Sequence, residues 1–282
     1  MIFEKARAKI NLTLDVLYKR PDGYHEVEMV MQTVDFCDYL SLTPRQDQQI
    51  VIRSSAPYIP TDERNLAYKA AEALRNHVGI RRGVEIDIDK RIPVAAGLAG
   101  GSADAAAVLR GLNHLWQLRL NFEELSRIGE EVGSDVPFCI YGGTAVVRGR
   151  GERVEPVALR PAFWVVLAKP PVAVSTAEIY HALDVQAIAH HPRAKEMMDA
   201  LRSEDVVAVA KAAGNVLEPV CSALYPETAK VKEQLIRLGS QVTLMSGSGP
   251  TVFGLFEREQ RARRAYNTMR ATLKEVYLCQ TC

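Results

Sequence analysis

The sequence predicts an α+β fold, because segments with the two-residue period of a strand and segments with the 3.6-residue period of a helix are mixed without strict alternation. The 282 residues, 48% hydrophobic and 24% charged, are typical of a globular protein and suffice for one large domain or two ordinary ones. The pattern restarts after a stretch that carries prolines near residues 155–161. We therefore expect two domains, at 1–155 and 156–282.

Strands open the N-terminal half. Apolar and polar residues alternate over 10–16, which is the period of a half-buried strand. Residues 20–23 (Arg-Pro-Asp-Gly) are typical of a turn, since proline sets φ and glycine accepts positive φ. A hairpin partner should follow at 26–36, and similar patterns predict strands at 40–43, 50–53 and 84–88.

Helices of the N-terminal half are marked by periodicity and by their ends. Apolar residues on one face predict a helix over 65–78, and a glycine-rich loop leads into a second helix over 102–116. Asn121 and Glu124 have the spacing of a capping box that opens a third helix. Pro137 suits the first turn of a fourth.

In the C-terminal half the pattern begins again with a strand at 163–169. Ser175 and Glu178 have capping-box spacing and predict a helix start. Helical periodicity covers 193–213, 226–238 and 259–273, and the remaining strands are expected at 242–245, 251–256 and around 276.

Composition excludes several classes of function. Lys and Arg number 35 and Asp and Glu 34, so a net charge of +1 gives no overall reason to bind nucleic acid or an anionic membrane. No uncharged run is apolar enough to span a membrane, and the first residues lack the apolar core of a secretory signal. Five scattered cysteines suit reduced thiols in a cytoplasm better than a disulfide framework.

The first candidate site is the glycine-rich loop at 93–103 (Pro-Val-Ala-Ala-Gly-Leu-Ala-Gly-Gly-Ser-Ala). Its glycines leave backbone N–H groups uncovered, and the alanine-rich run behind it favours a helix whose N-terminus attracts anions. The spacing matches neither a dinucleotide-binding G-x-G-x-x-G nor a Walker loop. A phosphate site and a plain strand–helix turn packed through small residues both remain open.

The second candidate is a polar pair, Lys9 and Asn11, which face the same side of the first strand about 7 Å apart. Because Ile10 and Leu12 take the core side, an ordinary solvated strand face is the simpler interpretation. In the alternative, Lys9 supplies the positive charge that the glycine loop lacks.

Two further loops carry chemistry-bearing residues. Asp135 stands at a helix start, where it is either a cap or a carboxylate beside a substrate hydroxyl in phosphoryl transfer. Residues 246–251 (Ser-Gly-Ser-Gly-Pro-Thr) form either a tight hairpin or a second ligand-binding edge, because glycine permits close backbone approach.

Together these blocks resemble the GHMP kinase superfamily. The resemblance rests on Pro-x-x-x-Gly-Leu-x-Gly-Gly-Ser at 93–102 for its phosphate loop and on 246–251 for its C-terminal glycine motif. Ala-Lys-Ile-Asn-Leu at 8–12, Arg-Pro-Asp-Gly-Tyr-His at 20–25 and Gly-Ser-Asp-Val-Pro at 133–137 resemble the branch whose substrate is methylerythritol linked to cytidine diphosphate.

The resemblance implies two α+β lobes, the N-terminal one with the phosphate loop and the C-terminal one ferredoxin-like. It implies a cytoplasmic kinase that uses ATP and Mg²⁺ to phosphorylate the 2-hydroxyl of this small molecule on the route to isoprenoid precursors. It also implies a monomer or weak homodimer without nucleic-acid or membrane partners.

Site residues are carried over from the resemblance by position. Lys9 would polarise the hydroxyl or stabilise the transferring phosphoryl group, and Asp135 would orient or deprotonate that hydroxyl. Ala99 and Ala103 stand where the family often has glycine and serine, so a second hydroxyl is missing beside Ser102. ATP would bind at Asn65, Lys90, Pro93, Val94, Ala95, Ala96, Gly97, Leu98, Ala99, Gly100, Gly101, Ser102 and Ala103, with Ser102 also a candidate Mg²⁺ ligand.

The resemblance places four residues around the cytidylyl substrate. The cytosine would stack on Tyr24 and be read at its edge by His25, whose ring both donates and accepts hydrogen bonds. Tyr180 would lie across the base, and Asn11 would contact the sugar alcohol.

Two alternatives from other classes stay open. A sugar or homoserine kinase of the same fold would have no use for Tyr24 and His25 as a base clamp. A nucleotide- or RNA-binding module without catalysis would need no Lys9 and Asp135 pair, and it should carry a basic stripe.

Overall fold

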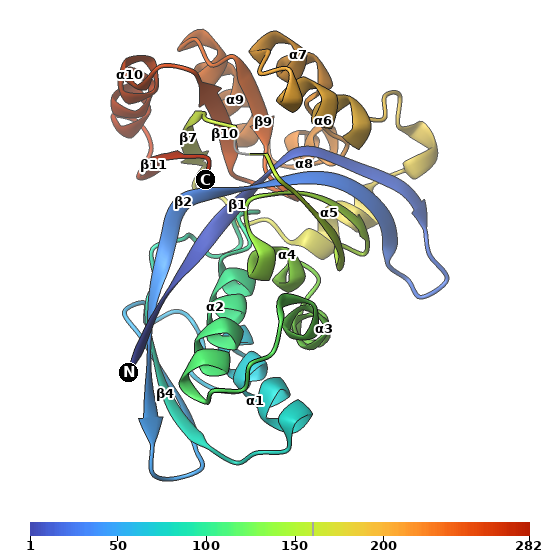
Figure 1. Cartoon of the computed structure of the whole chain (residues 1–282). Helices are drawn as coiled ribbons and strands as arrows, with labels where there is room; N and C mark the ends of the chain where they lie inside the picture. The colour runs from blue at the N-terminus through green and yellow to red at the C-terminus, as the bar shows by residue number, and fades with distance from the viewer. Residues whose placement is uncertain (160) are drawn as a thin grey trace. The chain divides into compact units, whose positions relative to one another are not determined.

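The computed structural model describes residues 1–159 and 161–282, and this part of the chain divides into two compact units. The first unit comprises Met1–Ala8, Cys37–Val94 and Ala99–Gly142, and the second Lys9–Phe36, Ala95–Leu98 and Gly143–Cys282. Strands β1 (Ile2–Lys19) and β2 (His25–Arg45) are long enough to contribute segments to both units (Figure 1).

The first unit contains four helices and a part of a sheet, and one buried cluster joins them. Here the end of β2 pairs antiparallel with β4 (Gly83–Asp89), and β3 (Ile50–Ser54) pairs parallel with β4. The helices are α1 (Leu66–Val78), α2 (Gly100–Leu115), α3 (Phe122–Val132) and α4 (Val136–Tyr141).

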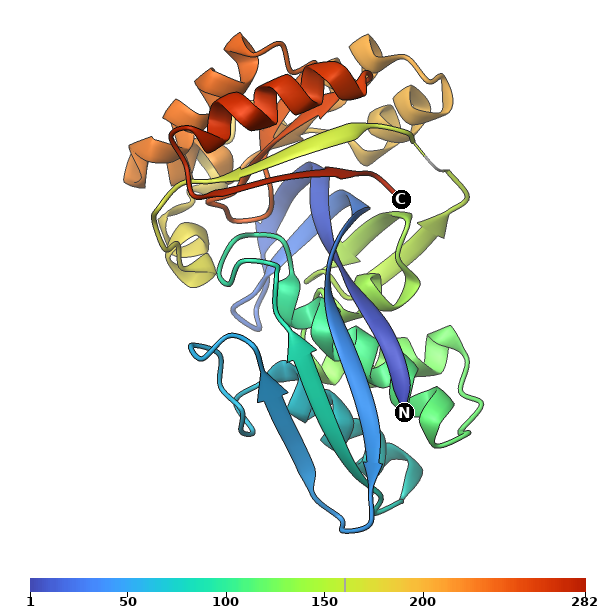
Figure 2. The ribbon, with the colours of Figure 1, turned by 90° about the vertical axis from the view of Figure 1, so that its left-hand side faces the viewer.

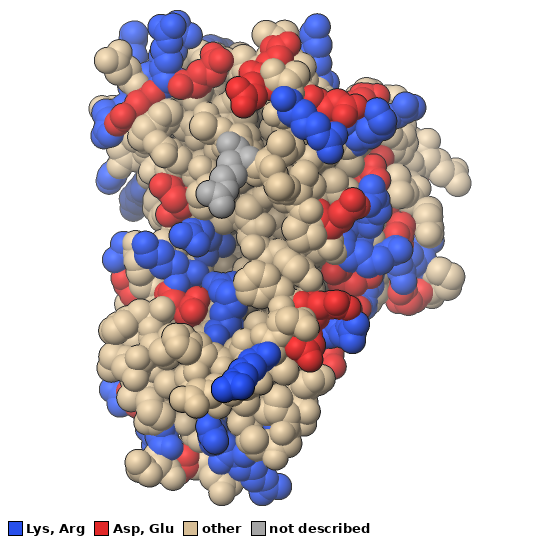
Figure 3. Space-filling view, viewed as in Figure 1, with Lys and Arg blue, Asp and Glu red and all other residues tan. Residues whose placement is uncertain are grey.

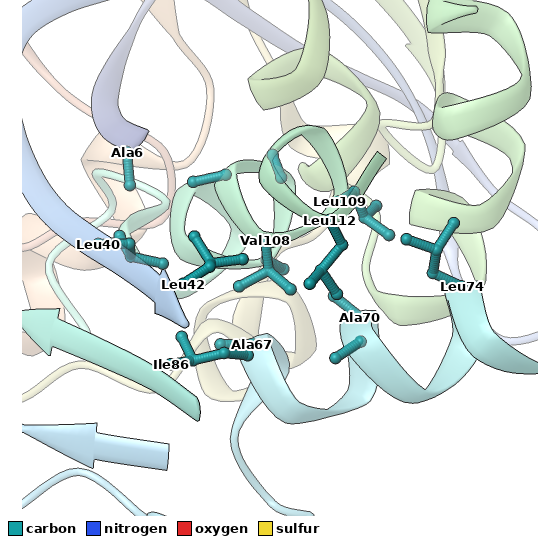
Figure 4. Packing of buried hydrophobic residues seen from close by; sticks show 14 of the residues in the cluster. Ala6, Leu40, Leu42, Ala67, Ala70, Leu74, Ile86, Val108, Leu109 and Leu112 are labelled. Carbon is teal, nitrogen blue, oxygen red and sulfur yellow. The ribbon is translucent and has the colours of Figure 1, made fainter. Parts of the chain in front are cut away.

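Alanines let the helices of the first unit approach the sheet and one another closely. Small residues on α1 and α2 are fully buried, so the larger side chains of β2, β4 and α2 interdigitate between them (Figure 4). The buried cluster includes Leu40, Leu42, Ala67, Ala70, Leu74, Ile86, Val108, Leu109 and Leu112.

The second unit contains a further part of the same strands. The start of β2 pairs antiparallel with β5 (Thr144–Gly149), which pairs with β6 (Arg153–Val157), and β8 (Gly214–Asn215) lies parallel to β1. Four helices and a short 3₁₀ turn lie in the chain between the first and second strands of the C-terminal sheet: α5 (Thr176–Ala182), η1 (Val185–Ala187), α6 (Ala194–Arg202), α7 (Val206–Ala212) and α8 (Glu218–Leu224).

The C-terminal sheet is antiparallel, with strand order β11-β7-β10-β9. Its strands are β7 (Trp164–Lys169), β9 (Val242–Met245), β10 (Val252–Phe256) and β11 (Glu275–Gln280). Helices α9 (Pro226–Arg237) and α10 (Glu259–Arg270) pack on it through one buried cluster, and α10 lies alongside β7 and β11 in Figure 2. This β-α-β-β-α-β order confirms the predicted ferredoxin-like arrangement.

Several predictions of local structure are confirmed. Asn121 and Glu124 form the capping box that opens α3, and Pro137 lies in the first turn of α4. Asn65 caps α1, which ends where the periodicity ends. Among the described residues, no helix is both long and apolar enough to cross a membrane.

Other predictions are wrong for identifiable reasons. The helix expected over 193–213 is two helices, because Glu204 has a left-handed φ of 55° and Asp205 caps α7. A helix does start after Ser175, as predicted, but the capping box does not form: Ser175 makes no side-chain capping bond, and the carboxylate of Glu178 instead accepts a hydrogen bond from Tyr225.

The first two strands are longer and more deeply buried than predicted. The segments 26–36 and 40–43 are one continuous strand, and β5, β6, β8 and α8 had no prediction. Residues 8–16 are buried on both faces, so the half-buried strand expected over 10–16 is wrong.

Candidate functional site

The glycine-rich loop has the backbone conformation of an anion site. Ala95, Gly97 and Ala99 have left-handed φ values of 51°, 73° and 56°, so every second residue lies in that region. Such alternation is typical of a nest, in which successive N–H groups converge on one anion. Two of the three are alanines, for which this region costs of order 1 kcal/mol each, and strain of this kind is retained mainly at functional loops.

The loop leads directly into the N-terminus of α2. Ala99 occupies the N-cap position without a side-chain capping bond, and the first turn carries no acidic residue. The first N–H groups of a helix lack partners within it, so this turn can donate to a phosphate. A side chain at Gly100 would come within 3.0 Å of Ile92, so glycine is needed there for packing as well.

Lys9 is buried beside the loop. Its side chain is held by two acceptors: Nζ donates to Oδ1 of Asn11 over 2.8 Å and to the carbonyl of Gly97 over 2.9 Å. Its backbone N–H donates to the carbonyl of Leu98 over 3.2 Å. Lys9 is 4% exposed and Asn11 1%, so the interpretation of this strand face as solvated is wrong, because neighbouring elements cover both faces of β1.

The loop between β9 and β10 contacts the Gly97 carbonyl, which also accepts from Lys9. Ser246 N–H donates to the carbonyl of Thr251 over 2.9 Å, which confirms the tight hairpin, and Ser246 Oγ donates to the carbonyl of Gly97 over 2.9 Å. A Cβ on Gly97 would lie 2.1 Å from the Ser246 carbonyl oxygen. Glycine is therefore required at 97 by close backbone approach; a ligand-binding edge at 246–251 stays a prediction.

Asp135 occupies the N-cap position of α4, yet its side chain makes no capping bond there. The interpretation as a simple helix cap is therefore not supported. Lys9 belongs to the second unit and Asp135 to the first, and their convergence on one hydroxyl stays a prediction.

Lys90 lies in a buried cluster of opposite charges in the first unit. Its Nζ is 2.6 Å from Oδ2 of Asp38 and 2.6 Å from Oδ2 of Asp104, and all three side chains are at most 4% exposed. Oδ1 of Asp38 accepts from the N–H groups of Arg91 and Ile92 over 2.5 and 2.7 Å. The cluster thus ties the residues just before the glycine loop to the first turns of α2.

The charges of this cluster are not all formed at neutral pH. Burial raises the pKa of Asp104 to about 8; Lys90 opposes this rise and Asp38 adds to it. For Lys90, burial alone would lower the pKa, but Asp104 and Asp38 outweigh it and raise that pKa. One ammonium between two buried carboxyls stabilises one ionised partner, so Asp104 keeps its proton near neutrality.

Asn65 has a defined role at the start of α1. Its Oδ1 accepts from Ala67 N–H over 2.9 Å, and its Nδ2 donates to the carbonyl of Pro60 over 2.7 Å. Contacts of Asn65 and Lys90 with adenosine stay predictions.

Three aromatic side chains predicted to hold the cytosine lie in the second unit, and two of them are in contact. The rings of His25 and Tyr180 are 5.1 Å apart at their centroids and tilted by 33°. Tyr24 is 54% exposed, as a platform for a ligand must be. Burial, and then Lys19, lower the pKa of His25 below its ordinary value. The imidazole is therefore neutral at pH 7, and one ring nitrogen accepts while the other donates.

Sequence reasoning missed several residues that shape these loops. Asn215 Nδ2 donates to the carbonyls of Met245 and Gly247 over 2.9 and 2.8 Å, and so holds the 246–251 hairpin. Thr176 Oγ1 lies 2.8 Å from Ser248 Oγ. No periodicity or motif points to such long-range polar partners.

The buried cluster gives a prediction about stability. Asp38→Asn should lower the free energy of unfolding by about 2–4 kcal/mol, because charge-assisted bonds to Lys90 and two backbone N–H groups weaken. Asp104→Asn should cost less than about 1 kcal/mol at pH 7, since the carboxyl it replaces is already neutral. Urea unfolding of both variants checks the difference.

The same cluster sets a pH dependence. Folded Asp104 keeps a proton that the unfolded chain releases, so this carboxyl makes the wild type lose stability as the pH rises from about 4 to 8. Asp104→Asn should lack that loss, and its stability relative to wild type should rise over this range. Equal pH slopes for the two proteins would contradict the assignment.

Two protein-family models match parts of the chain. Models of the GHMP kinases N terminal domain and the GHMP kinases C terminal domain match residues 65–143 and 197–275. A curated relative from Geobacillus sp. (strain WCH70), a 4-diphosphocytidyl-2-C-methyl-D-erythritol kinase, is 54% identical over 273 residues, which are 97% of this chain and 94% of the relative. One of the same name from Brevibacillus brevis (strain 47 / JCM 6285 / NBRC 100599) is 53% identical over 274 residues, again 97% and 94% of the two chains.

The structure of the chain is also similar to solved structures of kinases. A crystal structure of 4-(cytidine 5'-diphospho)-2C-methyl-D-erythritol kinase has a TM-score of 0.85 and 34% identity, covering 99% of both chains. Homoserine kinase from Cytophaga hutchinsonii has a TM-score of 0.79 at 22% identity, with 98% of this chain and 93% of that chain covered, and shows the shared fold alone.

Proposed function

We propose a residue-level mechanism for a chain that belongs to the GHMP kinases and, within them, to the 4-diphosphocytidyl-2-C-methyl-D-erythritol kinases. The chain is an ATP-dependent kinase that phosphorylates 4-diphosphocytidyl-2-C-methyl-D-erythritol on the route to isoprenoid precursors. The predicted resemblance and two-lobed α+β fold are thereby confirmed. We infer that the accepting group is the 2-hydroxyl.

One observation carries the mechanism: the ammonium of Lys9 is fixed 2.9 Å from the Gly97 carbonyl of the glycine loop. A buried cation held by a loop with converging N–H groups is suited to a phosphoryl group in transfer. We infer that residues 93–103 bind the ATP phosphates through backbone N–H groups and the N-terminus of α2, and that Asn65 and Lys90 lie toward the adenosine.

Lys9 and Asp135 have different proposed roles at the substrate hydroxyl. Lys9 stabilises the transferring group or polarises the hydroxyl, and Asp135 orients it or takes its proton. Phosphoryl transfer passes through a loose transition state, so the positioned carboxylate does not need to be a strong base. We infer that Asn11, which accepts a hydrogen bond from Lys9 over 2.8 Å, contacts the sugar alcohol.

The residues present fit a Mg²⁺ ion that is held mainly by nucleotide oxygens. Among the described residues, no group of three His, Cys, Asp or Glu side chains forms a metal cage. Ser102, half-buried in the first turn of α2, can supply one hydroxyl ligand. Bound there, Mg²⁺ would neutralise charge on the β- and γ-phosphates.

The cytosine site is inferred from the three aromatic residues of the second unit. Tyr24 supplies the stacking face, neutral His25 reads the hydrogen-bonding edge, and Tyr180 packs against His25 and closes the other side of the base. These roles distinguish the proposed substrate from homoserine or mevalonate, which have no aromatic ring.

The proposal extends to the domain bounds, the location and the partners of the chain. We infer domains at 1–155 and 156–282, a cytoplasmic location, and a monomer or weak homodimer. We also infer that the chain has no nucleic-acid partner, because a net charge of +1 gives no overall attraction to a long polyanion. On the face shown in Figure 3, basic and acidic side chains are interspersed.

A coupled assay of ADP release with ATP and Mg²⁺ tests the proposal. It compares 4-diphosphocytidyl-2-C-methyl-D-erythritol with homoserine, mevalonate and galactose. Turnover of the cytidylyl substrate alone is expected; folded protein without that turnover would refute the function. Phosphorus NMR of the product locates the new phosphate and checks the 2-hydroxyl.

Tyr24→Ala tests the stacking role. Loss of a ring under a base costs about 1–3 kcal/mol in nucleic-acid complexes, so KM for the cytidylyl substrate should rise about 5- to 150-fold with little change in KM for ATP. Tyr58→Ala, at another exposed tyrosine, is the control. An unchanged KM would rule out stacking on Tyr24.

A further inference from the structure

We propose that Arg150 is a positioning residue that holds the ring of Tyr24 in place for the cytosine. The Arg150 guanidinium carbon lies 5.1 Å from the centroid of the Tyr24 ring, within the range of a cation–π contact. Both residues belong to the second unit. The inference rests on the role proposed above for Tyr24, and it adds a residue that no motif in the sequence indicates.

The turn between β5 and β6 is shaped to present Arg150. Gly149 and Gly151 flank it with left-handed φ values of 78° and 115°, and Gly151 N–H donates to the carbonyl of Arg148 over 3.2 Å. Arg150 N–H donates to Oε2 of Glu152 over 2.5 Å. The Glu152 side chain folds across Gly149, where a Cβ would meet its carboxylate. The backbone at Arg150 is therefore well defined.

The turn that carries Tyr24 is fixed through its own backbone. Arg20 N–H donates to the Tyr24 carbonyl over 2.8 Å, and Tyr24 N–H donates to Oδ1 of Asp22 over 3.1 Å. Arg20 also pairs with Asp22 and with Glu26, over 3.0 and 2.6 Å. These bonds hold the backbone, but none of them holds the exposed ring.

Glu26 joins the two turns. Its carboxylate, 10% exposed, accepts from Arg20 on one side and from Arg153 of β6 on the other. The 20–24 turn and the 149–153 turn are therefore linked by charge, so Arg150 meets Tyr24 at a defined place. A ring that would otherwise rotate about two side-chain bonds is restrained by Arg150, while Tyr24 stays 54% exposed and so remains accessible to a base.

Steady-state kinetics of Arg150→Gln test the proposal. A cation–π contact at an exposed site is worth enough to raise KM for the cytidylyl substrate about 2- to 5-fold, with kcat and KM for ATP unchanged. Arg150→Lys should recover part of the loss, because an ammonium also binds a ring face. Arg270→Gln is the matched control, since Arg270 lies 5.8 Å from the centroid of Tyr266 on α10.

Two measurements separate positioning from direct contact with the diphosphate. Binding of cytidine, which has no phosphate, should weaken by the same factor as binding of the full substrate; unchanged cytidine binding would overturn the proposal. In a Tyr24→Leu background, Arg150→Gln should have no further effect, whereas additive losses would also overturn it.

The proposal can fail apart from the proposed function. If wild type neither binds cytidine nor turns over the cytidylyl substrate, the function fails, and NMR of tyrosine ring signals then tests the contact alone. Arg150→Gln should shift the Tyr24 signal, assigned with Tyr24→Leu, while Arg270→Gln should leave it in place. An unmoved Tyr24 signal, or wild-type kinetics for Arg150→Gln in an active enzyme, would refute the positioning role.

Discussion

Lys9→Met is expected to lower kcat about 10²- to 10⁴-fold, in the range found when one electrostatic or proton-transfer group is removed from an active site. The Lys9 ammonium is buried and held by Asn11 and by the Gly97 carbonyl. A positive charge fixed in a poorly solvated place needs no reorganisation during the reaction, and methionine keeps the length of the side chain without the charge.

The control for Lys9→Met is Lys5→Met, on the same strand but with an exposed side chain. Coupled-assay kinetics, with thermal unfolding to show that both variants are folded, give the comparison. KM for either substrate should change less than kcat, because the charge acts mainly on the transferring group. A folded Lys9→Met enzyme with near-native kcat would exclude Lys9 from the chemistry.

Asp135→Asn is expected to lower kcat by a similar factor of about 10²–10⁴. Its carboxylate is not used to cap α4, so its loss should leave that helix intact. Circular dichroism and unfolding in urea check that the variant is folded. Near-native kcat in Asp135→Asn would show that this carboxylate neither orients nor deprotonates the hydroxyl.

Comparison with Asp135→Ala distinguishes the two roles. Asparagine still presents an oxygen that can orient a hydroxyl, but it cannot take a proton. If Asp135 orients, the alanine variant should be clearly slower than the asparagine variant; if it is a base, the two should be equally slow. Glu123→Gln, at an exposed site on α3, serves as the control.

Local features of the fold were predictable because neighbours along the chain determine them. The capping box at Asn121 and Glu124, proline in the first turn of α4, and the glycine loop before α2 all depend on residues a few positions apart. The split near 203–205 was missed because its cause, a left-handed Glu204, leaves no mark in the periodicity.

Burial was the least predictable property. Alternation over 10–16 indicates one solvated face, yet every residue from 8 to 16 is buried. What covers the second face comes from distant segments, including Gly97 beside Lys9. Alternation alone cannot distinguish a solvated polar face from one whose polar groups are paired inside the protein.

Family membership, the glycine-rich loop and the identity of the candidate residues could be predicted from the sequence alone, because they depend on residue types at short spacings. Tertiary structure decided how the residues are held: Lys9 by Asn11 and Gly97, Lys90 by two buried carboxyls, and Tyr24 by Arg150. Each of these contacts joins segments or side chains whose meeting depends on how the strands and turns pack. The physical reason is that charge, burial and ring orientation are set by neighbours in space, which the spacing of residues along a chain does not specify.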